Sequence, residues 1–482
     1  MLFNSYAFLL AFLPLALLGY FACGRFSGVR TANGWLLLLS LFFYSYWDVR
    51  YLPLLLVSIA GNYLLASAML RAGDAGRRGW KRAAFAAGLL FNLGLLGYFK
   101  YLGFFIQIFD DLGAGLTVPQ VVLPLGISFF TITQLLYLYD CYAGARPEHR
   151  ILDYALFVSF FPHLLAGPIL YHRQMMRQFR DAALHVPDWH NLSAGLTLFL
   201  IGLLKKVVIA DALSPYVGAG FSQTAGLSTI AAWLTLVSYA LQLYFDFSGY
   251  SDMAVGLSRM MNFAIPVNFR TPYRATSLVN FWQRWHISLT NALTACVYMP
   301  CLRAFSRPDL RAVVVASFVT IFLVGIWHGA GWTFVVFALI HAVGVVCCHL
   351  WRRYGRPLPS VVGWLLTQGC FALSLVFFRA EDLSSARAML AALCGLHGTV
   401  WPAKLAAAAQ QTGLSLAAGD VPGALPKAVF AVALGLVLFA PGSNELLPRL
   451  RPRWYVALAF VAGGAYVLLE LTQPTEFLYF QF

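Results

Sequence analysis

Apolar residues form long runs along this chain, separated by short polar connections. About 20 consecutive apolar residues are needed for a helix to cross the hydrocarbon core of a bilayer. The runs therefore predict an all-α polytopic membrane protein with roughly eleven transmembrane helices. They cover residues 6–23, 35–47, 54–70, 83–109, 192–210, 227–245, 313–327, 333–350, 361–378, 426–439 and 454–471.

Three stretches interrupt this regular pattern. Residues 121–142 contain Pro124 and Gly126 among polar side chains, residues 156–180 contain two prolines and a basic end, and residues 249–290 have irregular hydropathy. Non-helical backbone at membrane depth is tolerated only where protein or a water-filled cavity surrounds it. We therefore expect re-entrant or broken helices in these stretches.

Composition and charge agree with a membrane protein. Of the 482 residues 60% are hydrophobic and only 11% are charged, and the net charge of +14 comes from short loops rather than from a basic domain. Lys and Arg are enriched in cytoplasmic loops, so the loops at residues 71–82 and 352–356 predict that both termini face outward. Nothing predicts nucleic-acid binding, and no linker divides residues 1–482, so we expect a single membrane domain with an outward-facing region at residues 379–425.

Histidines and acidic residues lie inside several apolar segments, where ionisable groups are costly and by default mark a function. His328 ends one run, and His286 lies in an irregular stretch. Histidine is suited to proton transfer because its unperturbed pKa is near 6.5. Each could instead be a buried histidine that only hydrogen-bonds within the helix packing. The eight cysteines form no metal-ligand spacing with histidine, so no metal is predicted.

Other polar and aromatic residues surround these histidines in the sequence. Asp246, Ser251 and Asp252 are predicted to share one side of a helix, where they orient a histidine, pair with an arginine or serve the packing. Four basic residues next to the core segments either bind the phosphates of a substrate or extend to lipid headgroups. These are Lys205, Lys206, Arg270 and Arg274, and the predicted supporting residues also include Trp282, Arg284, Trp285 and Trp327.

Six blocks of sequence between residues 120 and 335 occur in the order found in one family. In these blocks, and in its terminal segments NSYAFLLAFLP and EFLYFQF, the chain resembles the membrane-bound O-acyltransferase (MBOAT) family, in particular its bacterial polysaccharide-acetylating branch. The blocks are LPLGISFFTITQ, FFPHLLAGPI, GLLKKVVIAD, YALQLYFDFSGYSDMAVGLSRMMNF, FWQRWHISL and GIWHGAGWTF.

The resemblance implies a ring of helices around a central tunnel, with His328 and His286 as catalytic residues. It implies transfer of an acetyl group from cytosolic acetyl-CoA across the bacterial inner membrane, with both termini periplasmic. It also implies a periplasmic partner similar to SGNH hydrolases and a polysaccharide, such as alginate or cellulose, as final acceptor. Residues 290–305 depart from the branch, because the Arg-Asp pair and the double glycine that usually follow are missing.

Two other functions remain open at this point. The acyl group could be D-alanine or another acyl group destined for a cell-wall polymer. The protein could also transport a polysaccharide or lipid without chemistry, which predicts two repeated halves, and no such repeat is present. The C-terminal aromatic residues of segment 476–482 either form a belt at the membrane boundary or enter an outer vestibule near the site.

Overall fold

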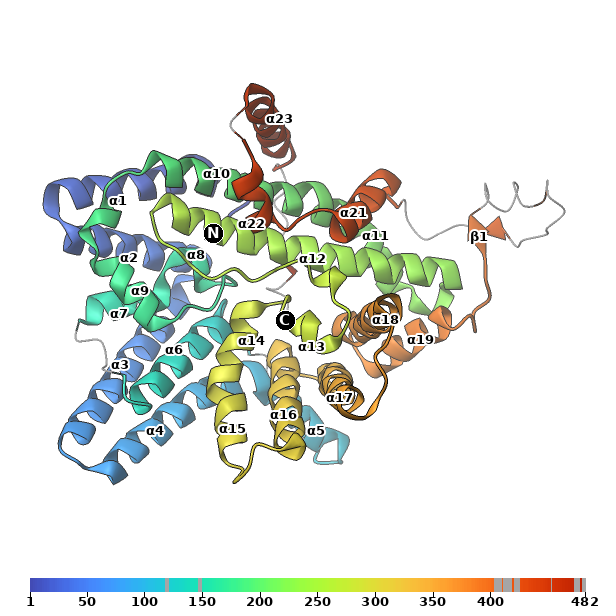
Figure 1. The fold of residues 1–482 in the computed structure, drawn as a ribbon, viewed down its shortest axis with the longest axis horizontal. Helices are drawn as coiled ribbons and strands as arrows, with labels where there is room; N and C mark the ends of the chain where they lie inside the picture. The colour runs from blue at the N-terminus through green and yellow to red at the C-terminus, as the bar shows by residue number, and fades with distance from the viewer. Residues whose placement is uncertain are drawn as a thin grey trace. The chain divides into compact units, whose positions relative to one another are not determined.

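The structure is a computed structural model that describes residues 1–117, 121–145, 150–402, 410, 418–419, 425–451, 453–471 and 477–478. Within these residues almost all regular structure is helical (Figure 1). The exception is a pair of two-residue strands, β1 (Trp401–Pro402) and β2 (Ala418–Gly419), which are parallel. The predicted all-α fold is therefore confirmed.

Eight helices in the described residues, or nine if a bent pair counts as one, are long and apolar enough to cross a membrane. This confirms a multi-pass membrane protein. The roughly eleven expected spans included the segments that form α2 (Val29–Ser45) and α23 (Trp454–Glu470), which have 17 residues each. Both are slightly shorter than the length of about 20 residues that a full crossing requires.

Packing divides the chain into two compact units, and whether they act as a single domain stays a prediction. Unit 1 comprises residues 1–203, 250–268 and 443–481, and unit 2 comprises residues 204–249, 269–442 and 482. Besides α2 and α23, the helices of unit 1 are α1 (Leu13–Ser27), α3 (Leu52–Asp74), α4 (Arg78–Leu96), α5 (Leu102–Asp111), α6 (Ile127–Tyr142), α7 (Ile151–Ser159), α8 (Phe161–Leu164), α9 (His172–Arg180), α10 (Trp189–Leu204, whose last residue belongs to unit 2) and α22 (Ser443–Leu446).

In unit 2, a π-helical turn at Lys205–Ala210 continues into α11. The α-helices that lie wholly in unit 2 are α11 (Asp211–Ser222), α13 (Leu278–Trp282), α14 (Ile287–Leu293), α15 (Met299–Arg303), α16 (Leu310–His328), α17 (Trp332–Tyr354), α18 (Ser360–Arg379), α19 (Leu383–Leu393) and α21 (Lys427–Phe439).

Helix α12 (Thr229–Met260) is 32 residues long and contributes residues to both units. In its most apolar window 78% of the residues are buried, compared with 11–39% for the other candidate spans. The predicted end of this span near residue 245 is wrong by about four turns, because the helix continues to Met260. The polar residues that lower its hydropathy lie in a buried helix and do not end it.

Unit 1 contains the two broken segments of the N-terminal half. Gly126 precedes α6 with φ of +73°, a left-handed conformation that glycine adopts without cost. A β-carbon at this position would lie 2.9 Å from the carbonyl oxygen of Leu164. Residues 156–180 form the short pieces α7, α8 and α9 instead of one span. The predicted interruptions are therefore present.

Polar side chains also join the helices of unit 1. Asn62 of α3 and Asn92 of α4 exchange amide hydrogen bonds of 3.2 and 2.6 Å. Gln134 of α6 donates to the hydroxyl of Ser58 at 2.8 Å and accepts from Tyr154 at 3.2 Å. Hydrogen bonds of this kind hold helices together where water is excluded.

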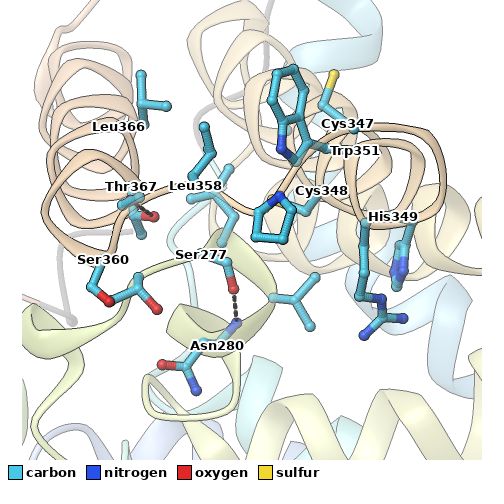
Figure 2. A pocket seen from close by; sticks show the side chains of 18 of the residues that line it. Ser277, Asn280, Cys347, Cys348, His349, Trp351, Leu358, Ser360, Leu366 and Thr367 are labelled. Carbon is cyan, nitrogen blue, oxygen red and sulfur yellow. Dashed lines mark hydrogen bonds between the residues drawn. The ribbon is translucent and has the colours of Figure 1, made fainter.

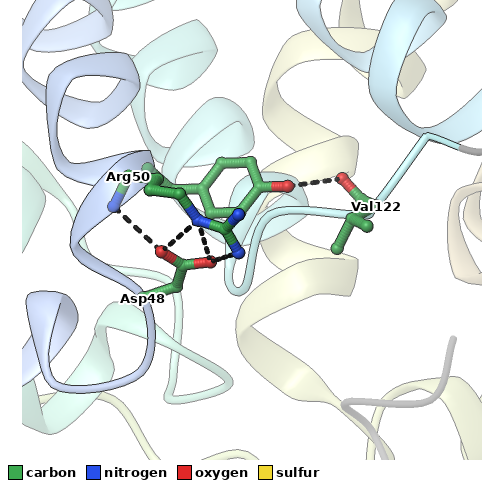
Figure 3. A network of polar contacts seen from close by, with 4 residues as sticks. Asp48, Arg50 and Val122 are labelled. Carbon is green, nitrogen blue, oxygen red and sulfur yellow. Dashed lines mark hydrogen bonds and ion pairs between the residues drawn. The ribbon is translucent and has the colours of Figure 1, made fainter.

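A small polar network fixes the turn that precedes α3. The Asp48 carboxylate accepts hydrogen bonds from the backbone and the guanidinium of Arg50, which lowers the pKa of Asp48 (Figure 3). The hydroxyl of Tyr51 donates to the carbonyl of Val122 at 3.4 Å. A 3₁₀ turn at Val49–Tyr51 links α2 to α3.

The C-terminal segment is described only at Phe477 and Leu478, which are both buried. The ring of Phe477 packs edge-on against Tyr250 of unit 1, with centroids 4.7 Å apart. The other residues of segment 476–482 lie outside the described part of the chain. An aromatic anchor is therefore present at Phe477, and the two predicted roles for the segment stay open.

Candidate active site

The two histidines predicted to be catalytic lie close together in unit 2. His328 is the last residue of α16, and His286 is the residue that precedes α14. Their ring centroids are 6.4 Å apart, and the side chains are 5% and 0% exposed. Two imidazoles from segments 42 residues apart in the chain thus meet inside the protein. At this separation, both rings can contact one small reacting group.

Aromatic rings enclose the pair. Phe247 of α12 packs edge-on against His286 with centroids 4.8 Å apart, and Phe378 of α18 packs edge-on against His328 at 5.4 Å. Trp327 contacts both imidazoles, at 6.1 and 5.2 Å. The two imidazoles therefore lie among aromatic side chains of α12, α16 and α18.

Glycines allow the backbone to place His328. Helices α16 and α17 pack side by side (Figure 1). A β-carbon on Gly325 would lie 2.4 Å from Ala338. A β-carbon on Gly329 would lie 2.2 Å from the ring of Phe334, which in turn packs against Phe378. The glycine after His328 is therefore required by the packing of the aromatic wall.

The backbone at His286 has an uncommon conformation. His286 has φ of +47°, and Thr271 in the same unit has φ of +44°. Left-handed conformations of non-glycine residues cost about 1–3 kcal/mol and concentrate at functional sites. Histidine tolerates this region better than most residues, whereas a β-branched threonine does not. Unit 2 therefore has strained backbone at His286 and at Thr271, which precedes it in the sequence.

The predicted supporting residues around His286 have structural contacts. Trp285 stacks on Phe281 and Trp282 packs edge-on against His341, with centroids 5.6 and 5.2 Å apart. Arg284 donates to the side chain of Asn280 at 3.0 Å and to the hydroxyl of Thr271 at 3.2 Å. These contacts connect the strained turn at residue 271 to the segment that carries His286.

A buried ion-pair cluster involves one predicted donor-binding residue. Lys206 is 2% exposed, and its Nζ lies 2.6 Å from Oδ1 of Asp246 and 2.8 Å from Oδ1 of Asp211. Asp246 thus pairs with a lysine, whereas one of the predicted alternatives was a pair with an arginine. Two carboxylates compensate the charge of Lys206, which removes the large penalty of an uncompensated buried ion.

The other three predicted donor-binding residues lie in different settings. Lys205 approaches the Ser248 hydroxyl at 3.4 Å and lies over the ring of Tyr244. Arg274 donates to the carbonyls of Leu438 and Ala440 at the end of α21, at 3.0 and 2.7 Å. The side chain of Arg270 is exposed. Binding of donor phosphates by the four residues stays a prediction.

The predicted common face for Asp246, Ser251 and Asp252 is wrong. All three lie on the continuous helix α12, which advances about 100° per residue. Ser251 and Asp252 therefore lie about 140° and 240° around the axis from Asp246. Both are buried and belong to unit 1, whereas Asp246 belongs to unit 2.

His341 is a further buried histidine near His328, and it was not predicted from the sequence to belong to the site. It lies on α17, is 0% exposed, and its Nε2 lies 2.9 Å from the hydroxyl of Ser374 on α18. Phe337 packs against both His341 and His328, with centroids 4.7 and 6.2 Å apart. An ionisable residue in the middle of an apolar run was the signal that could have indicated it.

The fold and the site together define a class of protein. A multi-pass helical membrane protein brings two buried imidazoles together, with ring centroids 6.4 Å apart. Such an arrangement suits a membrane-embedded transferase that uses histidine as a base.

Comparison with known proteins specifies this class. The family model described as "MBOAT, membrane-bound O-acyltransferase family" matches residues 117–364. The chain is 40% identical over 430 residues to the peptidoglycan O-acetyltransferase of Helicobacter pylori, covering 83% of this chain and 80% of that protein. It is 37% identical over 410 residues to the probable alginate O-acetylase AlgI of Azotobacter vinelandii, covering 82% and 78%. The chain belongs to the membrane-bound O-acyltransferase family, and it is an O-acyltransferase.

A more distant similarity bears on the acyl group. The teichoic acid D-alanyltransferase of Bacillus subtilis is 27% identical over 248 residues, covering 49% of this chain and 62% of that protein. These relatives together support O-acylation of polymers at a membrane. Membership of the family favours this chemistry over the transporter function that the sequence had left open.

Proposed function

We propose that this protein transfers an acetyl group from acetyl-CoA to a hydroxyl acceptor at His286 and His328. The observation that carries the proposal is the pair of buried imidazoles with ring centroids 6.4 Å apart. Acetyl is favoured as the acyl group because the relatives matched over about four fifths of this chain, at 37–40% identity, are named for O-acetylation. The D-alanyl relative is matched over only 49% of the chain.

In the proposed reaction, neutral His328 accepts the proton of the acceptor hydroxyl as its oxygen attacks the thioester carbonyl. A carbon–oxygen bond forms, the carbon–sulfur bond breaks, and the thiolate of CoA takes up the proton held by His328. His286 donates a hydrogen bond to the developing oxyanion or orients the acceptor. General-base catalysis typically contributes about 10²–10⁴-fold to the rate.

The proposal includes the direction of transfer and the partner. The protein lies in the bacterial inner membrane with both termini in the periplasm, and acetyl-CoA approaches from the cytosol. The acyl group passes through a central tunnel to a periplasmic protein similar to SGNH hydrolases, which delivers it to an exopolysaccharide such as alginate or cellulose. The basic residues 205, 206, 270 and 274 are proposed to attract the donor phosphates.

The experiment uses sealed inverted vesicles that contain the full chain. Acetyl-CoA labelled in the acetyl group is added outside, on the cytosolic face, and label is followed into polymer or protein in the lumen. We expect transfer with wild-type protein and with the exposed control variant His190→Ala, and none with His328→Ala. Transfer from a D-alanyl carrier protein but not from acetyl-CoA would contradict the acetyl assignment, and undiminished transfer by a folded His328→Ala would contradict the site.

A further inference from the structure

A cavity of about 750 Å³ lies at the C-terminal end of α17, on elements that belong entirely to unit 2. Its walls come from α13, the last turns of α17, the loop that follows and the first turns of α18. In Figure 2, Cys347, Cys348 and Trp351 of α17 line one side, and Leu366 and Thr367 of α18 line the other. The reaction proposed above does not use this cavity.

Two arginines give the cavity a positive charge. Arg352 lies in the last turn of α17 and Arg356 in the loop after it, and both are exposed. Among the described residues, no carboxylate is recorded within 4 Å of either guanidinium. Further polar groups in the wall come from Ser277, Asn280 and Ser360. The cavity can therefore supply both charge and hydrogen-bonding groups to an anion.

Part of the remaining lining is apolar and exposed. Trp351 is 51% exposed and Leu366 is 61% exposed, and Leu358 lines the cavity beside them. Helices α17 and α18 are candidate membrane spans, so exposed apolar side chains on them face lipid chains. Tryptophan and arginine at the end of a span are typical of the boundary between hydrocarbon and headgroups. The cavity thus has an apolar wall open to lipid and a basic end at that boundary.

The loop that carries Arg356 is held in place. The indole N–H of Trp351 donates to the carbonyl of Arg356 at 2.8 Å. A β-carbon on Gly355 would lie 2.7 Å from the Trp351 ring, so the close approach of the loop requires glycine. Pro357 and Pro359 follow and restrict the backbone. Because the loop is fixed, little ordering is needed before a ligand binds.

We propose that this cavity binds an anionic phospholipid of the phosphatidylglycerol type. Its phosphate lies between Arg352 and Arg356, and its acyl chains lie along Leu358, Leu366 and the indole of Trp351. Charge complementarity favours this occupant, because basic pockets between membrane helices bind anionic headgroups. The apolar wall favours a ligand with long acyl chains over a water-soluble phosphate.

The test compares lipid binding by the purified full chain with that of variants. Native mass spectrometry would measure retention of phosphatidylglycerol and phosphatidylcholine, and a thermal shift assay in mixed micelles would measure the stabilisation that each lipid gives. We expect selective retention of phosphatidylglycerol by wild type. Arg352→Gln and Arg356→Gln should each weaken its binding about fivefold, and the double variant about 25-fold.

Arg353→Gln is the matched control, because Arg353 adjoins Arg352 in the sequence but does not line the cavity. It should bind phosphatidylglycerol as wild type does. A second variant, Leu366→Trp, adds bulk to the apolar wall and should weaken retention of the diacyl lipid without changing the charge. Equal loss in Arg353→Gln would show a non-specific surface effect, and displacement by CoA with no lipid preference would identify a soluble phosphate ligand. Either result would overturn the proposal.

Discussion

Unit 1 and unit 2 both bury polar side chains among membrane helices, but they arrange them differently. In unit 1 the buried groups include amides that hydrogen-bond from helix to helix, as Asn62 does with Asn92, and three histidines, His163, His172 and His185. In unit 2 they include two imidazoles brought together from different segments and enclosed by aromatic rings. Two imidazoles in contact, rather than a single buried histidine, are the feature of unit 2 that suits proton transfer.

The difference shows that burial of a polar residue in a membrane protein does not by itself identify a catalytic group. Gln134 and Asn92 are as buried as His286, yet their hydrogen bonds account for their presence. Two observations in unit 2 together indicate a catalytic site more specifically than burial does. Two imidazoles that can transfer protons lie close together, and the backbone at His286 is strained. Lys206 and Asp246 show that unit 2 also buries polar groups that form an ion pair with one another.

The largest effect on stability is expected from breaking the buried ion-pair cluster of unit 2. Lys206→Met removes the cation that the carboxylates of Asp246 and Asp211 both contact, which should lower the free energy of unfolding by about 3 kcal/mol. Thermal or denaturant unfolding in detergent would measure this change. The double variant Asp246→Ala with Lys206→Met should recover most of the loss, because the buried carboxylate at position 246 is removed with the cation and Asp211 is partly exposed. If the single variant is as stable as wild type, the cluster is not a structural element.

A smaller effect is expected at the aromatic wall behind His328. Gly329→Ala forces the Phe334 ring to move, and overpacking of this kind costs about 1–3 kcal/mol. The acetyl-transfer rate of the folded protein should also fall, because Phe334 supports the ring of Phe378 that packs against His328. Gly369→Ala on α18 is the matched control, since a β-carbon there meets no neighbour within 4 Å. Equal activity in both variants would show that the wall does not position His328.

The smallest effect on activity is expected from the amide pair of unit 1. Asn92→Leu leaves Asn62 without its side-chain partner and should lower the free energy of unfolding by about 1–2 kcal/mol. The acetyl-transfer rate of the folded fraction should equal that of wild type. The double variant Asn62→Leu with Asn92→Leu should be more stable than the single variant. A large loss of activity at unchanged stability would give the unit 1 network a functional role.

The sequence predicted the membrane spans and the two histidines better than it predicted the contacts among buried side chains. Hydropathy located most spans because lipid-facing residues dominate their composition, whereas α12 was shortened because its polar residues are buried in protein. The pairing of Lys206 with Asp246 joins residues 40 positions apart, and no local pattern contains it. The left-handed backbone at His286 likewise depends on tertiary packing.

The most direct test of the central claim is the acetyl-transfer rate of His286→Asn, His328→Ala and the double variant, with folding checked for each. Asparagine tolerates the left-handed backbone at position 286, so this variant removes the imidazole with little added strain. We predict that each single variant loses about 10²–10⁴-fold in rate and that the double variant is no slower than the worse single variant, because the two rings act on the same step. A folded single variant with near wild-type rate, or losses that multiply in the double variant, would contradict the account.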